Sequence, residues 1–153
     1  MLYPKELFII LWLLGSSMLY AQVSFNDPHK QALPDADLNY ETCLNTENGQ
    51  STAGMIACAR EAETAWDKEL NRYYQLLMNV LKAAEKEKLR QSQRNWLMYR
   101  DSEFEFSGLF HNNMEGSMYL IFAADKRVEV VRQRTLELKY YYEDMLEYGH
   151  HRE

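Results

Sequence analysis

Apolar residues recur every three or four positions after Thr52, which is the pattern of one face of an amphipathic helix. The members of this stripe are Met55, Ala59, Ala62, Trp66, Leu70, Tyr73, Leu77 and Val80. The same spacing then reaches the polar residues Glu87, Gln91 and Arg94, so the apolar stripe ends before them. The pattern predicts a long helix that starts near Thr52, with Ser51 or Thr52 as its N-terminal cap.

A second apolar stripe, in a different helical phase, follows further along the chain. It contains Leu89, Trp96, Tyr99, Phe106 and Phe110. The change of phase predicts a turn over residues 83–87, although neither glycine nor proline stands there. The alternative is one unbroken helix through both stripes, which would be far longer than the average helix of a globular protein.

Residues 107–117 contain two glycines and two asparagines and have no apolar periodicity, so we expect a loop there. Ser117 is placed to cap a last long helix. The stripe of that helix is Met118, Ile121, Val128, Val131, Thr135, Leu138, Tyr142 and Met145. A short helix is expected over residues 37–44, before the turn-rich residues 45–50.

Three long amphipathic helices bury their stripes most economically against one another. The predicted fold class is therefore all-α, a small three- to four-helix bundle with one disulfide. The bundle domain is expected over residues 38–147, with a flexible arm at residues 22–37 and a C-terminal tail at residues 148–153.

The first 21 residues have the three parts of a secretory signal peptide. Lys5 precedes an apolar run over residues 7–14, and the small residues 15–17 lead toward Ala21. This run is too short to span a membrane, for which about 20 apolar residues are needed. We therefore expect cleavage near Ala21 and a mature bacterial protein in the periplasm or secreted, with no membrane insertion.

The chain of 153 residues has a formal net charge of −6. Residues 1–21 carry one charge of each sign, on Lys5 and Glu6, so the mature protein would keep the same net charge. An acidic surface argues against nucleic acid as a partner and favours a basic protein.

Cys43 and Cys58 are the two cysteines of the chain, and both follow the expected signal peptide. Exported proteins usually pair such cysteines, so we predict a disulfide between them. Closing a loop of about 15 residues stabilises a fold by roughly 3 kcal/mol. A zinc site is the alternative, but these thiols lack the close spacing and the histidine neighbours of zinc sites.

The sequence contains none of the common catalytic motifs, so no catalytic residue, cofactor or metal site is predicted. His150 and His151 stand in the polar tail, where solvated side chains are expected. His111 stands in the expected loop, and loops of this kind often carry function. The residues expected to contact a protein partner are Phe110, His111, Asn112, Asn113 and Glu115.

Several polar residues stand next to core positions at helical spacing. A buried arginine among them would need a carboxylate or carbonyl partner, because an unpaired buried charge costs several kcal/mol. We interpret the set as an interhelical polar network, with a ligand site as the alternative. Its members are Asp67, Asn71, Gln93, Arg100, Asp101 and Arg134.

Four segments together resemble the LprI-like lysozyme inhibitor family, secreted bacterial domains mostly of unknown role. They are C-A-R-E-A-E-T-A-W-D-K-E-L-N-R-Y-Y-Q-L-L at residues 58–77, L-R-Q-S-Q-R-N-W-L-M-Y-R-D at residues 89–101, G-S at residues 116–117 and R-Q-R-T-L-E-L at residues 132–138. The resemblance runs from about Cys43 to Leu138 and implies a helical, disulfide-bonded fold. Family members often have a second cysteine pair, and here Phe104 and Lys126 occupy those places.

Two functions of different classes are compatible with these observations. The first, which the resemblance implies, is an exported, non-enzymatic binding protein that inhibits lysozyme by covering its substrate cleft. The covering element would be residues 108–115 or an acidic helix face such as Glu61, Asp67 and Glu69. The second is an adaptor or structural module of the cell envelope that binds another protein and leaves lysozyme unaffected. The sequence pattern leaves the oligomeric state open.

Overall fold

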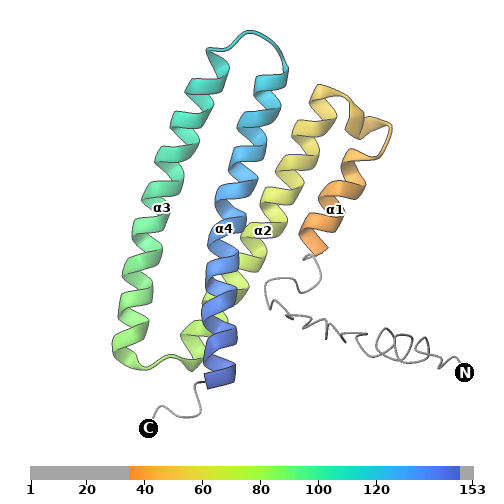
Figure 1. Ribbon diagram of the computed structural model, residues 1–153. Coiled ribbons are helices and arrows are strands. Elements are labelled where there is room, and N and C mark those ends of the chain that lie inside the picture. Colours follow the sequence, from red (N-terminus) through yellow and green to blue (C-terminus); the bar gives the residue numbers. More distant parts are fainter. Residues whose placement is uncertain (1–34, 149–153) are drawn as a thin grey trace, which may run out of the picture. The chain divides into compact units, whose positions relative to one another are not determined.

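The computed structural model describes residues 35–148 and confirms the all-α class (Figure 1). Its helices are α1 (Asp35–Leu44), α2 (Thr52–Val80), α3 (Ala83–Asn112) and α4 (Met118–Tyr148), with a short 3-10 turn, η3 (Asn48–Gln50), between α1 and α2. The expected signal peptide, most of the arm, and His150 and His151 lie outside the described residues. Within residues 35–148, no helix is long and apolar enough to cross a membrane.

The central helix is α4, which packs against α2 on one side and α3 on the other, while α1 packs against α2 (Figure 1). Most of the core lies between α2 and α4, where Trp66, Leu77, Val131 and Leu138 are at most 1% exposed. The predicted stripes of these two helices supply this core. Val80, at the end of the α2 stripe, is exposed.

The break between α2 and α3 lies at Leu81 and Lys82, so the predicted turn over residues 83–87 is wrong by a few positions. Both residues have extended backbone, which also excludes the single unbroken helix. The carboxylate of Glu85 accepts a hydrogen bond from the Lys82 N–H at 3.0 Å. Because this bond satisfies a free N–H at the helix start, residues 83–87 form the first turn of α3.

The stripe predicted for α3 is partly wrong. Leu89 and Trp96 face the bundle, but Tyr99, Phe106 and Phe110 are exposed. Since α3 packs mainly against α4, only a narrow face is covered, and this face is largely polar. It comprises Leu89, Gln93, Trp96, Arg100, Phe104, Ser107 and His111.

The predicted loop over residues 107–117 is wrong in its first half, because α3 continues to Asn112. The Asn113 N–H still donates to the Leu109 carbonyl at 3.2 Å, so the helical ladder runs past Gly108. One glycine costs a helix only about 1 kcal/mol, which the neighbouring turns outweigh. The turn itself occupies residues 113–117, where Gly116 has a φ of 111° that favours glycine. α4 begins directly after Ser117.

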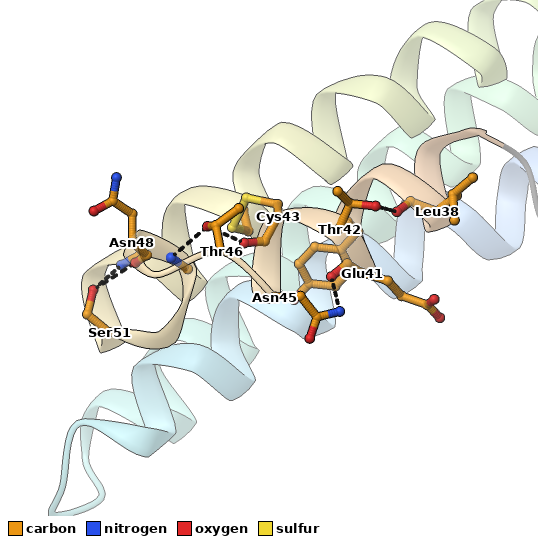
Figure 2. The surroundings of a disulfide bond; sticks show 12 residues. Leu38, Glu41, Thr42, Cys43, Asn45, Thr46, Asn48 and Ser51 are labelled. Atoms are coloured by element: carbon orange, nitrogen blue, oxygen red, sulfur yellow. Dashed lines mark hydrogen bonds between the residues drawn. A yellow bond between two sulfur atoms is a disulfide. The ribbon is translucent and has the colours of Figure 1, made fainter.

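The predicted disulfide between Cys43 and Cys58 is confirmed and joins the end of α1 to α2 (Figure 2). Side chains support the reversal between the two cysteines: Thr46 Oγ1 donates to the Cys43 carbonyl at 2.7 Å and accepts from the Gly49 N–H at 3.0 Å. Ser51 caps α2, as predicted, by accepting from the Gly54 N–H at 3.0 Å. α1 begins at Asp35, slightly earlier than residue 37.

Candidate protein-binding surface

The side of α3 that points away from α4 carries large apolar side chains. We call this set the outer face of α3; it consists of Met98, Tyr99, Phe106, Leu109 and Phe110, which are 49–67% exposed. Their spacing along the helix places them on one side, which adjoins the side of the half-buried Trp96 and the buried Ser107. Single exposed apolar residues are ordinary, whereas five on one side of a helix make that side a candidate interaction surface.

Aromatic rings continue from this face around the end of the hairpin. Phe106 stacks on Phe110 at 5.9 Å between ring centroids, and Phe110 meets His111 edge to face at 5.2 Å. His111 in turn approaches Phe122 of α4 at 6.3 Å, and Phe122 meets Tyr119 at 5.9 Å. We call these five residues the ring chain. It connects the end of α3 to the start of α4 across the turn.

The five residues predicted to contact a partner lie at this same end of the molecule. Phe110, His111 and Asn112 belong to the last turn of α3, Asn113 follows it, and Glu115 lies in the turn. His111 is half-buried, and its Nδ1 lies 2.8 Å from the Ser107 carbonyl oxygen and 3.2 Å from Ser107 Oγ. The imidazole is therefore held against its own helix, whereas the other four side chains are exposed.

Negative charge surrounds this end of the hairpin. Residues 101–118 include the carboxylates Asp101, Glu103, Glu105 and Glu115, and no lysine or arginine. Glu103 pairs with Lys126 of α4 at 3.1 Å and Asp101 pairs with Arg100 at 2.6 Å, whereas Glu105 and Glu115 are exposed. The outer face of α3 thus has an uncharged centre with an acidic rim.

A cleft separates α2 from α3, because each of them packs on α4 more extensively than on the other. It has a volume of about 950 Å³, and Ala123 and Ala124 of α4 are among its lining residues. Arg127 crosses it to Glu63 of α2 with two hydrogen bonds of 2.8 Å, and its guanidinium lies 4.0 Å from the ring centre of Phe104. Arg127 of α4 therefore contacts both sides of the cleft, α2 through the ion pair with Glu63 and α3 through Phe104.

The six residues interpreted as a polar network form three separate groups in the structure. Arg134 of α4 donates to Gln93 Oε1 at 3.2 Å and to Ser92 Oγ at 3.0 Å, which joins α4 to α3. Asp67 and Asn71 bond to each other within α2, and Arg100 and Asp101 bond to each other within α3. Glu137 completes the Arg134 group at 2.9 Å.

Other polar contacts between helices were not predicted from the sequence. Arg132 of α4 pairs with Asp37 of α1 at 3.0 Å, and the Asp37 carboxylate raises the pKa of that guanidinium. Tyr40 donates a hydrogen bond to Asp125, and burial together with this bond raises the pKa of the phenol. No local pattern identifies such pairs, since 85 and 95 residues separate their partners.

The described residues contain no group of three or more His, Cys, Asp or Glu side chains that could hold a metal ion. The exposed outer face of α3, the ring chain and their acidic rim form the main candidate site, and their composition is that of a protein interface.

Comparison of this chain with known protein families shows which family it belongs to. The sequence model of the family described as "Lysozyme inhibitor LprI" matches residues 43–138. The chain belongs to the LprI family. The matched range begins at the disulfide, spans α2 and α3 and ends within α4. It therefore contains the outer face of α3 and the whole ring chain.

Two individual proteins are also similar to this chain. An uncharacterized protein of Rhizobium meliloti (strain 1021) is 32% identical over 102 residues, which are 58% of this LprI-family chain and 72% of the relative. The crystal structure of an uncharacterized protein from Burkholderia thailandensis superposes with a TM-score of 0.72 at 32% identity. That match covers 78% of this chain and 58% of the Burkholderia chain.

Proposed function

We propose that this LprI-family protein is an exported, non-catalytic inhibitor that binds a basic lysozyme through the outer face of α3 and the ring chain. The family description supports lysozyme as the partner. The signal-peptide pattern of residues 1–21 supports export.

The observation that carries the proposal is the uncharged centre and acidic rim of the outer face of α3. Protein interfaces have apolar cores enriched in aromatic residues and methionine, and polar rims. The five side chains of the outer face expose roughly 600 Å², taking about 200 Å² for each full side chain. A standard interface buries about 800 Å² on each partner, so this face supplies most of what a stable complex needs.

Inhibition would follow from covering the substrate cleft. The end of the α3–α4 hairpin is built from regular helix up to Asn112, so it presents its side chains on a rigid support. Glu105 and Glu115 would face basic side chains around the lysozyme cleft, which speeds association and fixes the orientation of the complex.

In this proposal the element that contacts lysozyme is a face of a helix, whereas the sequence pattern had predicted a loop. Residues 108–112 are helical, and residues 113–117 form the turn beside them. The alternative acidic face on α2, around Glu61 and Glu69, is less suited to a partner, because among the described residues no large apolar side chain of α2 is exposed beside it.

The test is a turbidity assay of cell-wall lysis by several lysozyme types, with the oxidised protein titrated in. Phe106→Ser and Leu109→Ser each remove an exposed apolar contact and should weaken inhibition by about tenfold or more. Leu146→Ser is the matched control, since Leu146 is 52% exposed on α4 outside this surface, and it should inhibit like the parent protein. Circular dichroism of each variant checks the fold.

Two outcomes would contradict the proposal in different ways. If the parent protein inhibits none of the lysozymes, lysozyme is not the target, and an adaptor role in the cell envelope becomes the better hypothesis. If Leu146→Ser weakens inhibition as much as Phe106→Ser, the protein is an inhibitor but binds through another surface.

A further inference from the structure

A second, smaller cavity lies at the end of the bundle opposite the α3–α4 turn. It is open to solvent, and its lining residues come from the end of α2, the start of α3 and the end of α4. Figure 1 shows that these three helix ends lie at the same end of the bundle. Its volume is about 490 Å³, within the range of small-molecule sites. The lining residues are Leu77, Leu81, Glu85, Leu89, Tyr141, Asp144, Met145 and Tyr148.

The lining is mainly apolar and lies on well-supported elements. Leu77 is 1% exposed and belongs to the core, and Leu81 and Leu89 pack against that core. Tyr141 and Tyr148 are 54% and 61% exposed, so their rings are accessible to a bound molecule. The cavity can therefore take an apolar body, with aromatic rings available beside it.

Among the described residues, the charged lining residues of this cavity are the carboxylates Glu85 and Asp144. Glu85 is fixed by its hydrogen bond from the Lys82 N–H. Asp144 is half-buried near the end of α4. Carboxylates beside aromatic faces attract cations and disfavour anions, because both the charges and the ring quadrupoles present negative potential.

We propose that this cavity is a binding site for a small amphipathic cation, whose apolar part lies against Leu77, Leu89 and Met145. Its cationic group is bound among the tyrosine rings and the two carboxylates. The site is independent of the proposed lysozyme-binding surface, because none of its lining residues belongs to the outer face of α3 or to the ring chain.

The experiment compares three probes with the same alkyl chain and different head groups. Decyltrimethylammonium, decyl maltoside and decyl sulfate are titrated calorimetrically into the full chain, below their micelle concentrations. The cation should bind about tenfold more tightly than the neutral probe, and the anion should bind most weakly. Equal affinity for all three probes would overturn the proposal.

NMR signals of the methionine methyl groups show where the probe binds, and they need no substitution in the protein. Met145 lines the cavity, whereas Met98, midway along α3, and Met118, at the start of α4, are exposed outside it. The cation should shift the Met145 methyl signal and leave those of Met98 and Met118 unchanged. Shifts confined to Met98 and Met118 would mean adsorption to the exposed apolar surface and would contradict the site.

Charge selectivity is tested with Asp144→Asn, which should reduce the preference for the cation over the neutral probe several-fold. Glu129→Gln makes the same charge change elsewhere on α4 and should leave the preference unaltered. Sedimentation with and without the cation tests another occupant. If the probe dissociates a dimer, the cavity is an interface with a second copy and the proposal fails.

Discussion

The indole Nε1 of Trp66 donates a hydrogen bond of 3.0 Å to Oδ1 of Asp37. The same carboxylate accepts hydrogen bonds from Arg132 at 3.0–3.2 Å, and the Arg132 guanidinium lies 5.5 Å from the Trp66 ring centre. Asp37 thus joins α1 to α2 and α4. Since α1 has a single buried residue, Ala36, this polar contact is a main attachment of the helix.

Asp37→Asn should destabilise the fold by about 1–3 kcal/mol, because Arg132 loses its carboxylate partner while remaining partly buried. Urea unfolding monitored by circular dichroism measures the change. Asp35→Asn removes an equal charge from an exposed position of the same helix and should have little effect. Equal stability of the two variants would mean that the carboxylate is replaceable.

The raised pKa of Tyr40 predicts how the stability of the fold changes at alkaline pH. Its folded pKa is raised above the ordinary value of about 10, so the neutral phenol is favoured in the fold. Its contribution to stability is fully present below pH about 10 and is lost as the pH rises further, because the unfolded chain then binds fewer protons than the folded one.

The Tyr40→Phe variant lacks the hydrogen bond to Asp125 and should be less stable than the parent protein at neutral pH. The stability difference between the two should shrink above pH about 10. Urea midpoints measured from pH 7 to 11 test this. A constant difference over the whole range would contradict the shifted titration of Tyr40.

The disulfide should contribute roughly 3 kcal/mol to stability, because it closes a loop with a sequence separation of 15 residues. The double variant Cys43→Ser with Cys58→Ser should show this loss in urea unfolding. Adding a reductant should destabilise the parent protein by a similar amount and leave the double variant unchanged. A reductant effect on the double variant would point to another cause.

Gly49 and Gly108 should respond oppositely to alanine. A Cβ at Gly49 would lie 2.0 Å from the Cys43 carbonyl oxygen, so Gly49→Ala should cost about 1–3 kcal/mol or more. A Cβ at Gly108 meets nothing within 4 Å, and this residue lies inside α3. Gly108→Ala should therefore stabilise the protein by about 0.5–1 kcal/mol. Thermal unfolding of both variants decides the signs.

Glu105 tests the electrostatic part of the proposed lysozyme complex. Glu105→Lys reverses a charge on the rim of the outer face of α3 and should slow association with a basic lysozyme by a few-fold, chiefly at low salt. Surface plasmon resonance at two salt concentrations measures the rate. Glu47→Lys, an exposed acid before η3, is the control and should associate at nearly the parent rate.

The buried faces of α2 and α4 were predictable because these two helices cover each other. Trp66 and Leu138 stand on regular apolar stripes. Two long stripes of this kind are removed from water most simply by packing against each other. The stripe of α3 was misleading for the same physical reason. Its apolar residues Phe106 and Phe110 have no helix opposite them, and α4 meets the adjoining polar face instead.

The partner residues predicted from the supposed loop lie together at one end of the hairpin, but the loop itself is mostly helix. Glycine and asparagine were interpreted as loop signals at residues 107–112, yet Gly108 is accommodated inside α3. The exposed Met98 and Leu109 were absent from the predicted site. Their role depends on which face of α3 is covered, and helical periodicity alone does not set this.

By itself, the sequence determined the all-α class, the pairing of Cys43 with Cys58 and membership of the LprI family. These follow from local periodicity, from the presence of two cysteines and from segments that can be matched one by one. The tertiary structure decided which side of α3 faces solvent, and it brought together Asp37 with Arg132 and Glu63 with Arg127 across 95 and 64 residues. The reason is that such contacts depend on how whole helices pack, and packing is not encoded in any short stretch of the chain.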